Sequence, residues 1–111
     1  MCIRDSPVAA LAFRDVHLFS DLLLHDLGDA LADHRSDGGA DGREWRTAPL
    51  WGLRVMSDFL NGDAFLLHDG RARSVEEAVR FHGGEAEGVR RAFDALSPAD
   101  RRALLAFVES R

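Results

Sequence analysis

The clearest periodic pattern of apolar residues lies in Ser74–Gly84, with the sequence SVEEAVRFHGG. The positions i, i+3, i+4 and i+7, which share one face of a helix, are occupied by Val75, Ala78, Val79 and His82. Ser74 and the glutamate three residues later form the S-x-x-E capping box that starts a helix. The closing glycine pair supplies the positive φ at which helices stop, so we expect the last turn at Phe81 and His82.

Two further helices are predicted at the C-terminus. Within Glu85–Leu96, helical spacing is kept by Val89, Ala92, Phe93 and Leu96. Gly88 weakens this helix by about 1 kcal/mol relative to alanine. Ser97 as N-cap and Pro98 at the first helical position then begin a last helix. Its predicted inward-facing residues are Leu104, Leu105, Phe107 and Val108.

The remainder of the chain shows weaker patterns. Pro7–Phe19 is expected to be extended, Asp21–Leu31 to form a turn or one short helical stretch, and residues 33–43 to form a solvated loop. Pro49 biases the segment 43–53 towards an extended or turned path, and Arg54–Asp63 is expected to be a loop or weak helix. No segment alternates for long enough to indicate a substantial strand. The predicted fold class is therefore mainly α, with short helices and long loops.

The composition narrows the possible functions. The chain has 111 residues and 46% hydrophobic content, which fits one domain with a modest core. Its net charge is −5 and no basic face is concentrated anywhere, so nucleic-acid binding is not expected. No apolar run approaches the roughly 18 residues that a membrane span requires. All 14 cationic residues are arginine, which is typical of GC-rich coding and indicates no function.

The first six residues, MCIRDS, have a separate interpretation. They resemble the translated end of a transposon-type sequencing adapter, so we expect residues 1–6 to lie outside the natural protein and residues 7–111 to form the biological chain. The single cysteine, Cys2, then carries no redox or metal information. The natural N-terminus, with any signal peptide, is expected to lie upstream.

Three histidines are candidates for chemistry. His82 lies on the apolar face of its predicted helix. It is either a core residue hydrogen-bonded to a backbone carbonyl or a ligand of a metal or haem iron, and the periodicity leaves both interpretations open. His25 precedes Asp26 and His68 precedes Asp69, so a carboxylate could orient each imidazole, although a structural surface pair gives the same pattern. A zinc site from His25, His68 and His82 lacks any recognised ligand spacing.

The loops carry two further signals. The segment 43–53, REWRTAPLWGL, combines two tryptophans with arginines that could bind carboxylates such as haem propionates, or it is simply a loop fixed by aromatic packing. Residues 33–73 contain little regular structure, and such a length is uncommon inside a compact domain. A buried haem would organise these loops by offering them an apolar face, and a truncated domain would look similar.

Four segments together resemble the C-terminal part of the bacterial di-haem oxidoreductases. They are DLLLHDLGDALADHR, GREWRTAPLWGL, LLHDGRARSVEEAVRFHGGEAEGVRRAF and DRRALLAFVES. This family comprises peroxidase-like proteins, some called thiol oxidoreductases, that are distantly similar to di-haem cytochrome c peroxidase. The resemblance covers nearly all of the chain after residue 6.

The resemblance implies a two-domain periplasmic electron-transfer or peroxidase-type protein. Each domain would have a cytochrome c-like helical fold with one haem c attached through a CxxCH motif. Residues 7–111 would be an incomplete cytochrome c-like domain, the end of the second one, and the preceding part of the same protein would be their partner. No CxxCH occurs here, so these residues alone would supply neither the covalent anchor nor the proximal ligand, and we expect them to be inactive by themselves.

The resemblance also implies roles for individual residues. The end of the helix after the HDG turn carries the distal axial ligand of the C-terminal haem, often methionine, and this position is His82. His68, Arg46 and Trp51 would line the haem, and Arg46 or Arg71 would contact its propionates. The chain departs from its relatives where Leu27 replaces a common methionine and Ala48 replaces a common proline.

The alternative from a different class is a small, cofactor-free helical interaction module with structural histidines. A filled core without a concavity near His82 would favour that module. An apolar concavity beside His82, lined also by His68 and the tryptophan loop, would favour the haem protein.

Overall fold

The structure is a computed structural model that describes residues 2, 3 and 7–111, without the side chains of residues 2, 3 and 57. Most of the predicted adapter segment 1–6 lies outside the described residues. The elements in chain order are β1 (Cys2–Ile3), β2 (Arg14–Asp15), β3 (Leu24–Asp26), the 3₁₀ turn η1 (Asp29–Leu31), β4 (Glu44–Arg46), α1 (Leu53–Phe59), α2 (Val75–Phe81), the 3₁₀ turn η2 (Gly84–Ala86), α3 (Glu87–Asp94) and α4 (Pro98–Glu109).

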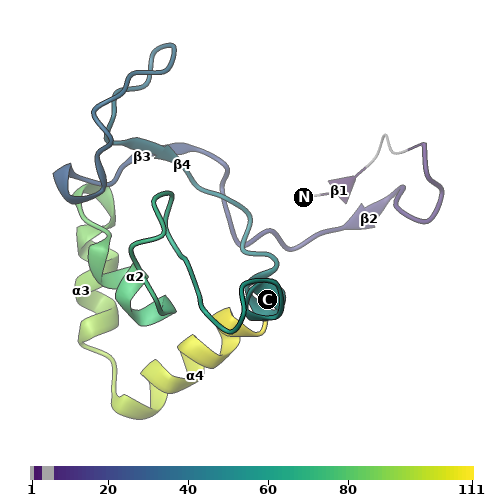
Figure 1. The fold of residues 1–111 in the computed structure, drawn as a ribbon. Coiled ribbons are helices and arrows are strands. Elements are labelled where there is room, and N and C mark those ends of the chain that lie inside the picture. The colour runs from purple at the N-terminus through teal and green to yellow at the C-terminus, as the bar shows by residue number, and fades with distance from the viewer. Residues whose placement is uncertain (1, 4–6) are drawn as a thin grey trace.

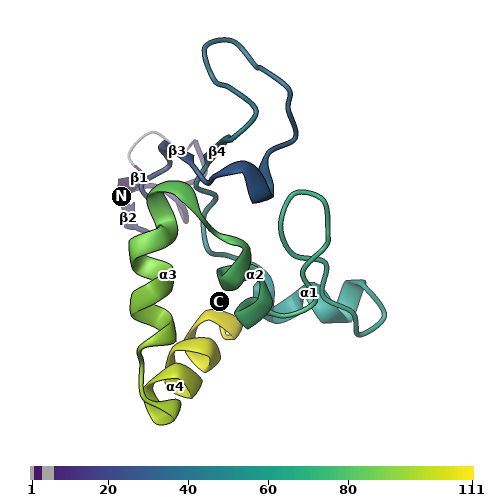
Figure 2. The ribbon, with the colours of Figure 1, turned by 90° about the vertical axis from the view of Figure 1, so that its left-hand side faces the viewer.

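Helices form one side of the molecule and a two-stranded ladder closes another. Helix α4 packs against α1 and α2, while β3 packs against β4 and η2. The hairpin of β1 and β2 projects from this body as an arm (Figure 1). Seen from the side, the loop between β3 and β4 and the loop after α1 extend away from the helices (Figure 2). The described residues thus bear out the mainly α prediction in part: helices are the main regular elements, and short strands that the sequence pattern did not indicate accompany them.

The capping box predicted for α2 is largely confirmed. The Ser74 hydroxyl accepts a hydrogen bond from the Glu77 amide at 3.1 Å. The Glu77 carboxylate, however, accepts from the Arg73 amide at 2.7 Å rather than from the cap residue itself. The helix ends at Phe81 as expected, but His82 is already extended, with φ −67° and ψ 127°. The chain therefore leaves the helix through His82 and not through a left-handed glycine directly after it.

The start of α4 matches its prediction, whereas its inward face does not. The Ser97 hydroxyl accepts from the Asp100 amide at 3.2 Å, and a proline occupies the first turn. Of the residues expected to face inward, Leu104 is 41% and Phe107 39% exposed. For these two residues the expectation was wrong: α4 packs mainly against α1 and α2, and Phe107 meets the ring of Phe19, which is itself 50% exposed. In α3, likewise, Phe93 is buried while Val89 is 73% exposed.

The β3–β4 ladder was the main structural feature missed. It is antiparallel, with the pairs Leu24 to Arg46, His25 to Trp45 and Asp26 to Glu44. Segment 21–31 was expected to form a turn or helical stretch, and it holds β3 before the 3₁₀ turn η1. Its three strand residues are too few to show alternation, so pairing with a distant segment decides their conformation.

The described residues enclose little core. The buried hydrophobic side chains are Leu18, Leu31, Ala72 and Phe93. The radius of gyration over Cα atoms is 16.0 Å, compared with about 13 Å for a compact domain of this length. This radius includes the projecting β1–β2 arm, and the other elements form a frame whose inner space holds the candidate site.

Candidate functional site

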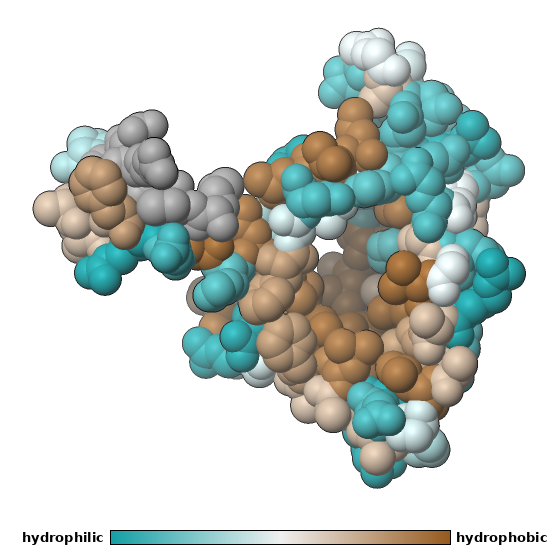
Figure 3. All heavy atoms as spheres, turned by 180° about the vertical axis from the view of Figure 1, so that it is seen from behind, coloured by the Kyte–Doolittle hydropathy of each residue, from teal (hydrophilic) through white to brown (hydrophobic). Residues whose placement is uncertain are grey.

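A cavity of about 850 Å³ lies between the β3–β4 ladder, the end of α2, and the start of α3. Its wall is made of His25, Leu27, Leu31, Trp45, Arg46, Thr47, Ala48, Leu67, His68, His82, Glu85, Ala86 and Val89. A hollow bordered mainly by hydrophobic residues is visible from the back of the molecule (Figure 3). Its volume falls within the roughly 300–1,000 Å³ of ligand pockets. Both residues that depart from the resembling family, Leu27 and Ala48, contribute to the apolar wall.

His82 contributes an imidazole from the C-terminal end of α2. Its Nδ1 lies 2.8 Å from the carbonyl oxygen of Ala78. A carbonyl can only accept, so Nδ1 carries the proton and donates, and in the neutral ring Nε2 keeps its lone pair. Metal-bound histidines commonly use such a bond to fix their tautomer, but so do structural histidines. The hydrogen bond is therefore compatible with ligation by Nε2, and His82 is one of the residues that line the cavity.

His68 and Trp45 form a stacked pair on the wall. Their ring centroids are 3.7 Å apart and the planes differ by 20°. His68 lies in a loop closed by paired hydrogen bonds between Leu66 and Ala72. The indole Nε1 of Trp45 is buried and has no hydrogen-bond partner in the part of the chain that the structure describes. Trp45 thus presents a broad aromatic surface to the cavity and one unpaired donor within its wall.

Arg46 follows Trp45 on β4 and also lines the cavity. Its side chain is exposed, and it makes no ion pair or side-chain hydrogen bond with any described residue. A guanidinium in this state is available for bidentate binding of a carboxylate. The guanidinium of Arg46 is therefore available to bind an anionic group in the cavity.

The rim of the cavity holds a cluster that we call the histidine clamp, made of Asp21, His25 and Glu85. His25 Nδ1 lies 2.8 Å from Glu85 Oε2, and its Nε2 lies 2.8 Å from Asp21 Oδ2. Glu85 and then Asp21 hold the pKa of His25 above its ordinary value of 6.5. His25 in turn lowers the pKa of Glu85, and the Leu23 amide followed by His25 lowers the pKa of Asp21.

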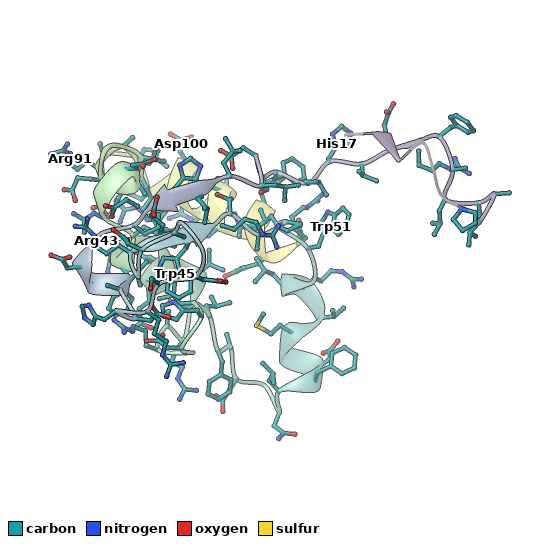
Figure 4. All side chains as sticks on the ribbon, turned by 90° about the horizontal axis from the view of Figure 1, so that it is seen from above. His17, Arg43, Trp45, Trp51, Arg91 and Asp100 are labelled. Carbon is teal, nitrogen blue, oxygen red and sulfur yellow. The ribbon has the colours of Figure 1, made fainter. Side chains whose placement is uncertain are left out.

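Trp51 and Arg71, also expected beside a cofactor, do not line this cavity. The Trp51 indole donates to the carbonyl of His17 at 3.1 Å and is 55% exposed. Figure 4 shows Trp51 on the same side of the molecule as His17 and away from Trp45. Arg71 pairs with Asp69, donates to the Ala30 carbonyl at 2.6 Å, and lies over the Phe81 ring. The structure thus brings together His82, His68 and Arg46, and places the other two elsewhere.

The His-Asp dipeptides left two interpretations open, and the one in which the aspartate orients the imidazole is not borne out. In the part of the chain that the structure describes, neither histidine is hydrogen-bonded to the aspartate that follows it. The Asp26 carboxylate accepts from the Gly28 amide and lies 3.4 Å from Arg43, while Asp69 pairs with Arg71. In β3, successive side chains point to opposite sides of the strand, which separates His25 from Asp26. One actual partner of His25, Glu85, is 60 residues away in the sequence, so no local signal could have identified it.

Two residues of the site were not singled out by sequence reasoning. The sequence places Trp45 and Trp51 in one aromatic loop, and only the tertiary structure shows that Trp45 lines the cavity. The helical spacing indicates Glu85 only as the first residue of a helix.

No group of three or more histidine, cysteine or acidic side chains among the described residues is arranged to hold a metal ion. No helix in the described part of the chain has both the length and the apolar character for a membrane crossing.

The family is decided by a match over almost the entire chain. The family model described as "di-haem oxidoreductase, putative peroxidase" matches residues 2–111. The chain belongs to the di-haem oxidoreductase family. Comparison with curated proteins and with solved structures found no match. The family's name implies haem, so the cavity of this di-haem oxidoreductase is the place to test for it.

The cavity wall fits a haem group chemically. A porphyrin is a flat apolar ring with two carboxylates at one edge, and the wall offers apolar side chains, an aromatic surface at Trp45 and an unpaired cation at Arg46. His82 offers one imidazole nitrogen, the atom type that serves as an axial ligand of haem iron. When bound, the haem would supply the redox-active iron on which electron transfer and peroxide chemistry depend.

Proposed function

We propose that this chain forms the distal side of a haem c pocket in a periplasmic di-haem oxidoreductase of the peroxidase type, within an incomplete cytochrome c-like domain. The observation that carries the proposal is His82: its Nδ1–H is held by a backbone carbonyl while its ring lines an apolar cavity of about 850 Å³. Family membership supports the haem, and the cavity supports its position.

The residues around the cavity would have distinct tasks. His82 Nε2 would be the distal axial ligand. His68, stacked on Trp45, would present an aromatic wall to the porphyrin and exclude water from that side. Arg46 would bind a propionate, and Arg71 would act indirectly, by fixing the loop of His68 through Asp69 and Ala30. Trp51 would support the frame through His17.

The covalent anchor and the proximal ligand would come from polypeptide outside these 111 residues, because they contain one cysteine and no CxxCH. We propose the preceding part of the same protein as that partner. The cofactor-free interaction module predicts a filled core near His82, and the open apolar cavity beside that residue counts against it.

The decisive experiment replaces His82 by alanine in the complete gene, expressed with the cytochrome c maturation system. Loss or alteration of a low-spin haem spectrum is expected, because two axial nitrogen ligands favour the low-spin state. His34→Ala is the matched control, since that residue lies in the exposed 33–43 loop and does not line the cavity. An unchanged spectrum in His82→Ala would remove the ligand assignment.

A further inference from the structure

The histidine clamp joins two parts of the chain that are distant in sequence. His25 belongs to β3, and Glu85 to η2, the turn that directly follows His82. Ionised carboxylates only accept hydrogen bonds, so both ring nitrogens of His25 donate and the ring is a cation between two anions. Such charge-assisted bonds are shorter and stronger than neutral ones. The clamp is therefore a directional link between the ladder and the turn.

Backbone contacts continue this link towards His82. The Gly83 amide donates to the Leu27 carbonyl at 3.1 Å, and Glu85 Oε1 accepts from the Asp26 amide at 3.4 Å. A Cβ atom on Gly84 would overlap the Asp26 carbonyl oxygen. The turn after His82 therefore rests directly on the backbone of β3, in a contact that only glycine permits.

Helix α2 by itself does not fully fix the orientation of the His82 side chain. It is the C-cap of α2, and its backbone is already extended, so the regular helix fixes only the side towards Ala78. The direction of the ring also depends on where residues 83–85 are placed. Those residues are placed by β3 and the clamp.

We propose that His25 and Glu85 are positioning residues for His82: the clamp anchors the turn 83–85 to β3 and so aims the imidazole of His82 into the cavity. The inference rests on the proposed function, in which His82 ligates the haem iron. Because the clamp requires a protonated His25 and ionised carboxylates, the ligand's position becomes sensitive to pH. As pH rises and His25 loses its proton, one of its two bonds is lost and the turn loosens.

Few other charges face His25. Asp26, on the same strand, pairs with Arg43, and Glu44 on β4 accepts from the Asp41 amide. Arg46 on β4 has no partner among the described side chains and lies across the ladder, one residue from the position opposite His25. The bonds that respond to His25 are therefore those of the clamp itself.

The test compares charge-removing variants of the full haem-loaded protein. His25→Gln and Glu85→Gln each remove one charge of the clamp, and Glu87→Gln is the matched control, since Glu87 pairs with Arg90 within α3 at 2.8 Å. Hydrogen exchange of a peptide covering residues 82–86 reports the Gly83 amide, in both haem-loaded and haem-free protein. The His82-dependent low-spin spectrum is followed from pH 5 to pH 10.

Both clamp variants are expected to speed exchange of this peptide by about threefold or more and to lower the low-spin fraction at neutral pH, with Glu87→Gln unchanged. Wild type should lose low-spin signal at alkaline pH with a transition that is absent in His25→Gln. If both variants keep wild-type exchange and the same pH profile while His82→Ala abolishes the signal, the positioning role is overturned and the proposed function stands. If His82→Ala changes nothing, both proposals fail.

Discussion

The imidazole of His82 and the indole of Trp45 define the chemistry of the cavity at the scale of single residues. One offers a lone pair on Nε2, because its Nδ1 donates to the Ala78 carbonyl, and the other offers an aromatic surface stacked on His68. Their neighbours Gly83 and Gly84 matter as much, because their lack of a side chain allows the backbone of β3 to approach.

The two tryptophans should differ in their contribution to stability. Trp45→Ala loses the stack on His68 and should lower the free energy of unfolding by about 2 kcal/mol, whereas Trp51→Ala loses one exposed hydrogen bond and should cost about 1 kcal/mol or less. Trp45→Phe keeps a stacking ring and should stay within about 1 kcal/mol of wild type. Urea denaturation measures all three. Equal costs for the two alanine variants would contradict the placement of Trp45.

Two glycines four residues apart should respond in opposite directions. Gly84→Ala should destabilise by about 2 kcal/mol or more, because Gly84 has φ +55° and a Cβ atom would overlap the Asp26 carbonyl. Gly88→Ala in α3 should stabilise by about 0.5–1 kcal/mol, since a Cβ there meets nothing within 4 Å. Thermal unfolding of the pair separates the effects, and a tolerated Gly84→Ala would rule out the close contact with β3.

At the scale of elements, helices here depend on local signals and the ladder depends on distant ones. Helices α2 and α4 each begin at a serine whose hydroxyl accepts from the amide three residues on. Strands β3 and β4 exist because they pair, and the clamp then attaches the ladder to η2. Substitution of a capping residue should therefore weaken one helix, whereas a change in the clamp should weaken the contact between the ladder and η2.

Removal of a cap should weaken its own helix. Ser97→Ala is expected to lower stability by about 1 kcal/mol, because the Asp100 amide loses its acceptor. Ser97→Asp keeps an acceptor and should restore most of the loss. Circular dichroism during denaturation measures both, and an equal loss in the two variants would show that the cap bond is not the cause.

The clamp should give stability a bell-shaped dependence on pH. The raised pKa of His25 adds stability that is fully present below its ordinary value of 6.5 and is lost as pH rises through the raised value. The lowered pKa values of Glu85 and Asp21 add stability that is present above 4.5, the higher of their ordinary values, and is lost as pH falls through the lowered values. The difference in melting temperature between wild type and His25→Gln should therefore be largest between pH 4.5 and 6.5. A difference that is constant from pH 4 to pH 9 would contradict this.

At the scale of the whole molecule, the elements surround a cavity instead of a filled core. Few hydrophobic side chains are buried among the described residues, and the radius of gyration exceeds that of a compact domain of equal length. A frame of this kind gains stability from whatever fills it, because a ligand that binds only the folded state shifts the unfolding equilibrium.

Free ferric haem should therefore stabilise the 111-residue chain. At a haem concentration of about 100 times Kd, the melting temperature should rise by about 10 °C or more. His82→Ala should reduce the rise, because it removes the proposed iron ligand. Differential scanning calorimetry with and without haem measures the shift. An equal rise in wild type and His82→Ala would contradict the ligand role of His82.

The sequence by itself determined what depends on neighbouring residues. The capping serines, the helical spacing and the proline at the start of α4 predicted α2 and α4, and four ordered motifs indicated the family that the match over residues 2–111 then established. These signals lie in short stretches of the sequence, so they can be recognised without the three-dimensional structure.

Only the tertiary structure decided which side chains meet. It separated Trp45 from Trp51, gave His25 the distant partner Glu85 in place of Asp26, and left Leu104 and other predicted core residues partly exposed. The physical reason is that strand register and the packing of helices on other elements are set by contacts between residues tens of positions apart. Spacing along the sequence does not encode those contacts, so the cavity and its clamp could be found only in three dimensions.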